Sequence, residues 1–215
     1  MKLLTATKSA WLIIALIYAA FFSWYTSFSG PLTPAEIEHY MALTEQRDPG
    51  APAEDRARLR AFMEEDTGDD FVMINVIHMY DKPLQIDGVE PGDTADDVLA
   101  KYMEYMLPAM LSRASHPVFR GPAVSTAMDI MNADGMETWS VGAGVRYRSR
   151  RDLLEIATNP AFEGRHEFKV AAMAKTIAFP VDPFIYLGDP RLVLAFLLGL
   201  IGCGLSWLFA ARRQT

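Results

Sequence analysis

The sequence predicts an α+β domain of βαββαβ order, preceded by a helical appendage and placed between two membrane-spanning helices. Three observations support this prediction. An uncharged apolar run lies near each end of the 215-residue chain, all 27 acidic residues lie between the two runs, and the segment between them alternates strand-like and helix-like patterns. The expected parts are a tail at 1–8, a first span at 9–29, the appendage at 30–69, the α+β domain at 70–190, a second span at 191–211 and a tail at 212–215.

Each apolar run is long enough to cross a bilayer as a helix, which needs about 20 residues. Trp24 and Tyr25 at the end of the first run are typical of a membrane interface and too bulky for a signal-peptide cleavage site, so we expect an uncleaved anchor. Basic residues flank the runs on the sides of the two termini. The positive-inside rule then predicts an inner (plasma) membrane protein with both termini cytoplasmic and the domain periplasmic or extracytoplasmic. These basic residues are Lys2, Lys8, Arg212 and Arg213.

Small residues recur four apart along both apolar runs, a spacing that lets helix backbones approach closely in lipid. We predict that they form helix-packing seams, either between the two spans or against helices of another protein. The alternative is that Ala and Gly are simply common in spans. The seams are Ala15, Ala19 and Ser23 in the first run, and Ala195, Gly199 and Cys203 in the second.

The segment after the first span predicts two short helices. Thr33 followed by Glu36 is a capping-box pattern and Pro34 suits a first helical position, so a helix is expected over 34–45. A loop with Pro and Gly then precedes a charged helix over 53–65, whose apolar stripe is narrow. We expect this appendage to lie across the domain or along a partner.

Strand and helix patterns alternate through the rest of the domain. Residues 71–80 are β-branched and apolar on both faces, which indicates a central strand covered on both sides. Thr94 and Ser149 are suitable N-caps for two helices. The predicted order is strand 71–80, helix 95–113, strand 122–130, strand 138–147, helix 150–158 continued over 161–175 after a break at Asn159-Pro160, and strand 176–181. This is the split-βαβ, ferredoxin-like order, which places both helices on one face of the sheet and leaves the other face to be covered.

This stretch resembles the dimeric α/β-barrel superfamily, especially its small stand-alone domains of uncharacterised function. The residues that carry the resemblance are the block from Tyr147 to Asp152, the break from Asn159 to Phe162, Arg165, and Leu107-Pro108. The resemblance implies a homodimer that covers the sheet. It also implies a range of activities, from monooxygenases and haem-binding enzymes to lactone isomerases, among which fold alone does not select. The two spans and the appendage depart from the usual compact pattern, so a partner chain is the alternative cover for the sheet.

No catalytic motif in the domain stands out from its structural explanation. His78, Asn75 and Arg146 are the candidates for a site on the sheet face away from the helices, because histidine suits proton transfer near neutral pH and polar groups in a covered strand need partners. Each of the three has a structural alternative as a hydrogen-bonded strand residue. The basic run from Arg146 to Arg151 is either an anion or partner site, or a solvated strand end.

Metal and cofactor signals are weak. Glu163 and His166, three residues apart on a predicted helix, form half of a metal site at most. The lone Cys203 excludes a metal site built on several cysteines. We therefore expect no metal and no cofactor.

An acidic domain is a poor binder of nucleic acid, because the phosphate backbone repels it. Two other functions remain open. The favoured hypothesis is a non-catalytic accessory or scaffold subunit of a larger inner-membrane complex, respiratory or photosynthetic, whose partners are other subunits or a second copy of the chain, together with the bilayer. The alternative is a membrane-anchored, cofactor-independent oxygenase-like or small-molecule-binding protein that uses the sheet face of a dimeric α/β barrel.

Overall fold

The computed structural model describes residues 2–212, with side chains from residue 6 onward. The predicted basic residue Arg213 therefore lies outside the described residues, as does the side chain of Lys2. The chain forms two compact units, one made of the two terminal helices and one made of residues 27–182.

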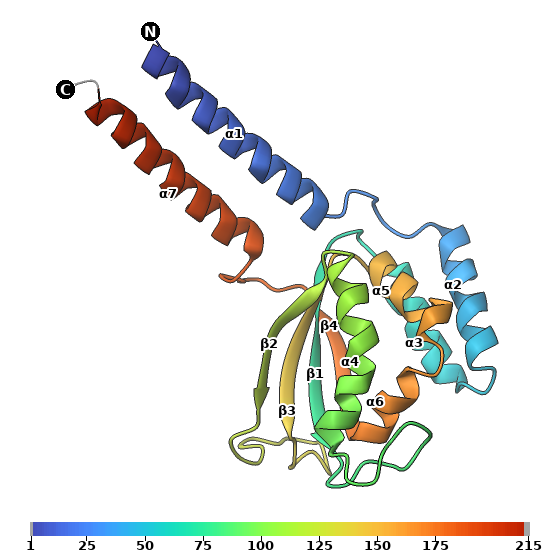
Figure 1. Ribbon diagram of the computed structural model, residues 1–215. Helices are drawn as coiled ribbons and strands as arrows, with labels where there is room; N and C mark the ends of the chain where they lie inside the picture. The colour runs from blue at the N-terminus through green and yellow to red at the C-terminus, as the bar shows by residue number, and fades with distance from the viewer. Residues whose placement is uncertain (1, 213–215) are drawn as a thin grey trace. The chain divides into compact units, whose positions relative to one another are not determined.

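The first unit pairs α1 (Lys2–Tyr25) with α7 (Pro190–Ala211), which lie side by side (Figure 1). Ala6–Tyr25 and Pro190–Ala211 are long and apolar enough to cross a membrane by length and composition. Helix α1 ends before the expected end of the first span at residue 29. Many large apolar side chains on both helices are exposed on this pair, as a lipid environment would require.

The ring of Trp11 on α1 packs over Gly202 on α7, where the two helices are in contact. The indole N–H of Trp11 donates a hydrogen bond to Ser206 Oγ at 3.0 Å, and a Cβ on Gly202 would lie only 2.6 Å from the Trp11 ring. Gly199, by contrast, has open space where its Cβ would be. The packing of the predicted seams on a further helix stays a prediction, because most of their residues are exposed on the pair: Ala15, Ala19, Ser23, Ala195 and Cys203.

The second unit contains the α+β domain, and its element order is the predicted one. Its elements are β1 (Phe71–Met79), α4 (Ala95–Leu111), β2 (His116–Pro122), β3 (Val141–Tyr147), α5 (Arg150–Ala157), a 3₁₀ turn (Pro160–Phe162), α6 (His166–Ala172) and β4 (Met173–Val181). The strands form one antiparallel sheet in the order β2-β3-β1-β4. The helices α4, α5 and α6 cover one face of this sheet (Figure 1).

The second strand was predicted at the wrong place. Residues 122–130 were expected to form it, but the strand is His116–Pro122, and most of 123–140 is irregular loop. The strand contains Pro117 and Pro122, which are tolerated because β2 is an edge strand, where a missing N–H can face solvent. The apolar residues that suggested the later strand are exposed, and Val124 is 99% accessible.

The appendage consists of α2 (Pro34–Arg47) and α3 (Ala53–Glu64), and it packs on the domain. The predicted capping box is confirmed: Glu36 N–H donates to Thr33 Oγ1, and the Glu36 carboxylate accepts from the Thr33 N–H. A small core joins the two helices to α5 of the domain. It is made of Leu32, Ile37, Tyr40, Met63 and Leu154.

A close backbone approach holds the start of the appendage. Gly68 has a φ of +86°, and a Cβ there would lie 2.5 Å from the backbone of Gly30. Asp66 accepts hydrogen bonds from the N–H groups of Leu32 (2.8 Å) and Gly68 (3.1 Å), so one buried carboxylate ties the two segments together.

Candidate functional site

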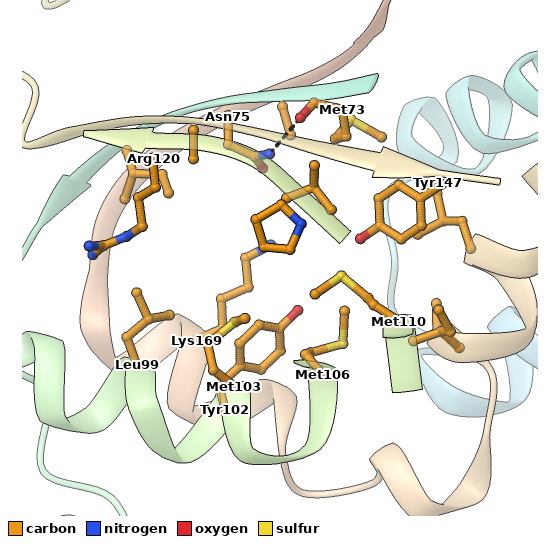
Figure 2. Close-up of a pocket in the computed structure, with 18 of the residues that line it drawn as sticks. Met73, Asn75, Leu99, Tyr102, Met103, Met106, Met110, Arg120, Tyr147 and Lys169 are labelled. Carbon is orange, nitrogen blue, oxygen red and sulfur yellow. Dashed lines mark hydrogen bonds between the residues drawn. The ribbon is translucent and has the colours of Figure 1, made fainter. Parts of the chain in front are cut away.

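The domain contains a cavity of about 350 Å³, partly open to solvent, between the sheet and the helices α4, α5 and α6 (Figure 2). The cavity lies on the helix-covered face of the sheet. Alternate residues of a strand point to the same side, so every second residue of a strand can line it. On β1 these are Met73, Asn75 and Ile77, and their register partners Ala143 and Val145 continue the wall on β3.

The walls are largely apolar and unusually rich in methionine. Met103, Met106 and Met110 come from α4, and Met73 and Met173 come from strands β1 and β4. Methionine side chains are flexible and polarizable, so such a wall can adapt to ligands of different shape.

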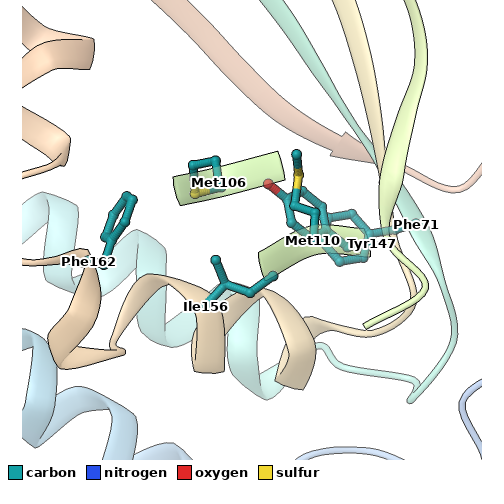
Figure 3. Packing of buried hydrophobic residues seen from close by; sticks show 6 residues of the cluster. All are labelled: Phe71, Met106, Met110, Tyr147, Ile156 and Phe162. Carbon is teal, nitrogen blue, oxygen red and sulfur yellow. The ribbon is translucent and has the colours of Figure 1, made fainter. Parts of the chain in front are cut away.

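One end of the cavity merges with the main hydrophobic core. Figure 3 shows the packing of this core cluster, which consists of Phe71, Met106, Met110, Tyr147, Ile156 and Phe162. The ring of Phe162 lies 5.7 Å from that of Tyr102 and 5.1 Å from that of Tyr105, and the Arg47 guanidinium of α2 lies 5.9 Å from it on another side. Arg47 also donates to the carbonyl oxygens of Ala157 and Asn159, so the appendage braces this wall.

Few polar groups interrupt the apolar lining, and they converge. Tyr102 on α4, Tyr147 on β3 and Lys169 on α6 point from three walls into the same space (Figure 2). Asn75 projects from β1 and donates from Nδ2 to the carbonyl oxygen of Met73 at 3.0 Å.

The electrostatics of the cavity favour neutral groups. Burial raises the pKa of Tyr147 to about 12, and burial together with the Tyr147 charge raises the pKa of Tyr102. Desolvation lowers the pKa of Lys169. It also lowers the pKa of His166, to which the charges of Lys169 and Arg47 contribute. Positive charge in this cavity is therefore less well solvated than it would be at the surface.

This arrangement belongs to a fold with structural relatives of unknown function. The chain matches no protein-family model and no curated protein sequence. It is similar to the crystal structure of RPA0582, a protein of unknown function from Rhodopseudomonas palustris, at 17% identity and a TM-score of 0.50, over 63% of this chain and 96% of that one. The methylated form of RPA0582 matches at 18% identity and the same TM-score, over 63% and 93% of the two chains.

A further solved structure is described as a dimeric protein of unknown function with a ferredoxin-like fold, from Bacteroides fragilis. It matches at 16% identity and a TM-score of 0.31, over 53% of this chain and 96% of that one. At these identities the similarity to RPA0582 shows the fold alone.

The structure brings only one of the three candidate site residues into the cavity. Asn75 lines it, but His78 lies on the opposite face of β1, where Nδ1 is 3.1 Å from Ser140 Oγ. Arg146 is almost fully buried and is engaged by Asp70 (2.8 Å) and the carbonyl oxygen of Ala114 (2.7 Å). The expected grouping of these three side chains on the sheet face is therefore not formed.

The basic run beyond Arg146 holds the domain and its appendage together. Arg148 donates to Asp152 at 2.9 and 2.7 Å, whereas Arg151 pairs with Glu36 at 2.8 Å. Arg150 lies 3.6 Å from Asp66, with its guanidinium 4.7 Å from the Phe62 ring. These arginines are internal ion-pair partners, not a solvated strand end.

The Glu36–Arg151 pair predicts an acid-sensitive attachment of α2. The hydrogen bond from Arg151, with that from the Thr33 backbone, lowers the pKa of Glu36 from 4.5 to about 2. A lowered folded-state pKa stabilises the fold above pH 4.5, and this stabilisation is lost as the pH falls from 4.5 toward 2. Glu36→Gln should cost about 1 kcal/mol near neutral pH and nothing at the acidic end.

Urea denaturation of the full chain in detergent, followed by circular dichroism across that pH range, measures this prediction. Glu54→Gln is the matched control, since Glu54 is exposed and lies on α3. An equal effect of both substitutions at every pH would contradict the role assigned to the Glu36 pair.

Glu163 and His166 were expected on one helix, and this expectation is wrong. The 3₁₀ turn ends at Phe162, Gly164 has a φ of +73°, and α6 begins only at His166. Within residues 2–212 no cluster of His, Cys, Asp or Glu is placed to hold a metal ion.

Sequence reasoning missed Lys169, Tyr102 and Tyr147 as functional candidates. Tyr102 was expected only within the helix 95–113, and Tyr147 only as a strand residue of the resemblance. The sequence feature that could have pointed to Lys169 is its position one helical turn after His166, on a helix expected to pack against the sheet.

Proposed function

We propose that this chain is a membrane-anchored protein that binds an apolar small molecule in the cavity between α4 and the sheet. The observation that carries the proposal is the cavity itself. Its volume of about 350 Å³, its methionine and aromatic walls and its few converging polar groups are typical of a ligand-binding site. The dimeric α/β-barrel resemblance agrees with this role, since that superfamily includes enzymes that act on small organic substrates.

The anchor belongs to the same proposal. Helices α1 and α7 would cross the inner membrane, with both termini cytoplasmic and the domain outside. The exposed Phe184, Ile185 and Leu187 precede α7 and would suit the membrane interface. An apolar compound that partitions into the bilayer would be concentrated near a protein anchored in this way.

Blocking the cavity tests the proposal. Ala143 faces the cavity from the centre of β3, so Ala143→Phe should fill the space and abolish binding. The full chain, with ¹³C-methyl methionine and in lipid nanodiscs, is titrated with decanol. The cavity methionines, such as Met103 and Met106, should show saturable shifts in the wild type, whereas the exposed loop methionines Met128 and Met131 should not.

Ala127→Phe in the β2–β3 loop is the matched control and should bind decanol as the wild type does. If the methyl signals of the cavity methionines in the wild type do not shift with decanol, decanoate or decylammonium, the cavity is not a binding site for such compounds.

A second candidate function rests on the other face of the sheet. Ile177 and Phe179 on β4 are 40% and 46% exposed, and Phe119 on β2 covers Gly144 at 51% exposure. Exposed apolar surface of this kind favours a protein partner, either a second copy or another subunit of a membrane complex. Purification from native membranes in mild detergent tests this role, and migration as a single isolated chain would contradict it.

A further inference from the structure

Lys169 is the one charged group of the cavity whose side chain points inward and, among residues 6–212, forms no hydrogen bond or ion pair (Figure 2). It is half-buried, and most residues of the cavity wall are apolar or aromatic. Lys101, by contrast, has partners within the domain. Its ammonium donates to Asp93 at 2.6 Å and to the carbonyl oxygen of Gly88 at 2.7 Å. Leaving an ammonium unpaired beside apolar walls is unfavourable unless something else neutralises it.

The rest of the lining offers this ammonium no counter-charge. The described wall residues include three basic side chains and no aspartate or glutamate. Of the other two basic groups, Arg120 already pairs with Asp96 at 3.1 Å, and His166 lies one helical turn before Lys169 with its ring 6.1 Å from that of Phe162, so it supplies no negative charge. The hydroxyls of Tyr102 and Tyr147 form no hydrogen bond with the described residues, so both are free to donate to an acceptor in the cavity.

We propose that the ligand is an amphipathic carboxylate, whose head group pairs with Lys169 and whose apolar body lies against the methionines of α4. This inference rests on the proposed function and names the ligand class. A carboxylate supplies the missing negative charge, and its oxygens accept from an ammonium and from tyrosine hydroxyls. The apolar body replaces contact with water by contact with Met103, Met106 and Met110.

Three probes with one alkyl chain separate the head group from the body: decanoate, decanol and decylammonium. Each is titrated into the full chain in nanodiscs, and the Kd is read from the cavity methionine methyl signals. The wild type should bind decanoate about tenfold or more tightly than decanol, and decylammonium least tightly. Lys169→Met should weaken decanoate binding by about the same factor and leave decanol binding unchanged.

Lys82→Met is the matched control, because Lys82 is exposed on the loop after β1 and the substitution changes the net charge equally. It should preserve the preference for decanoate. Decanol binding by Lys169→Met reports that the variant is folded, and the order of the three affinities in the wild type does not depend on any variant.

The outcomes separate the two proposals. Equal binding of decanoate and decanol by the wild type, or a preference that survives Lys169→Met, would overturn the carboxylate proposal and leave the binding cavity in place. Failure of all three probes to shift the cavity methionines would overturn both.

Discussion

Replacing Arg146 by alanine is expected to lower the free energy of unfolding by about 3–5 kcal/mol. Arg146 is only 1% exposed, and its guanidinium satisfies Asp70 and the carbonyl oxygen of Ala114. The substitution removes a buried side chain and leaves both acceptors without this donor, and losing one partner of a buried ion pair costs more than losing an exposed pair. Urea denaturation of the full chain in detergent, followed by circular dichroism, measures the change.

Arg120→Ala is the control for this experiment. Arg120 is paired with Asp96, but both side chains are more than half exposed, so the expected cost is about 1 kcal/mol or less. If Arg146→Ala were no more destabilising than Arg120→Ala, the pairing assigned to Arg146 would be wrong, and its earlier candidacy as a ligand-binding residue would reopen.

Phe162→Ala is expected to cost about 3–5 kcal/mol of stability and to weaken decanol binding in the cavity. The Phe162 ring is 6% exposed, contacts Tyr102 and Tyr105 on α4, and closes the end of the cavity against the core. Its removal leaves a void between α4 and the 3₁₀ turn, and the cavity would lose a wall. The same denaturation experiment and the methionine titration measure the two effects.

Phe184→Ala provides the comparison, because Phe184 is fully exposed in the segment before α7. It should change neither the stability of the domain nor the affinity for decanol. A Phe162→Ala protein with wild-type stability would show that the packing around the 3₁₀ turn does not hold the cavity closed.

The local signals in the sequence were reliable where short-range chemistry decides the outcome. The capping box at Thr33 forms as expected, and Thr94 and Ser149 cap α4 and α5 as expected, because each uses a side chain three residues from its partner. The place of β2 could not be recognised in the same way. Its prolines are tolerated only because it lies at the edge of the sheet, and edge position depends on how four distant strands pair.

The candidate site shows the same division. Asn75 was identified because a polar residue in an apolar strand is conspicuous, but it was expected on the face away from the helices, and it lies on the helix-covered face, in the cavity. Lys169 was not identified, because an isolated lysine on a short helix resembles a surface residue until the fold turns it toward the sheet. The sequence could not decide between the two roles left open for Arg146, because its partner Asp70 is 76 residues away in the chain and no local pattern indicates that contact.

The sequence by itself determined the α+β class, the order of the domain's strands and helices, the two long apolar helices and the caps of the main helices. These follow from hydrophobic periodicity and from contacts within one helical turn. Only the tertiary structure decided that Arg146 is buried against Asp70, that His78 and Asn75 face opposite sides of one strand, and that Lys169 enters an apolar cavity. Which side of a helix or strand is buried depends on segments far apart in the chain. That burial decides whether a charged side chain is solvated or needs a partner inside the protein.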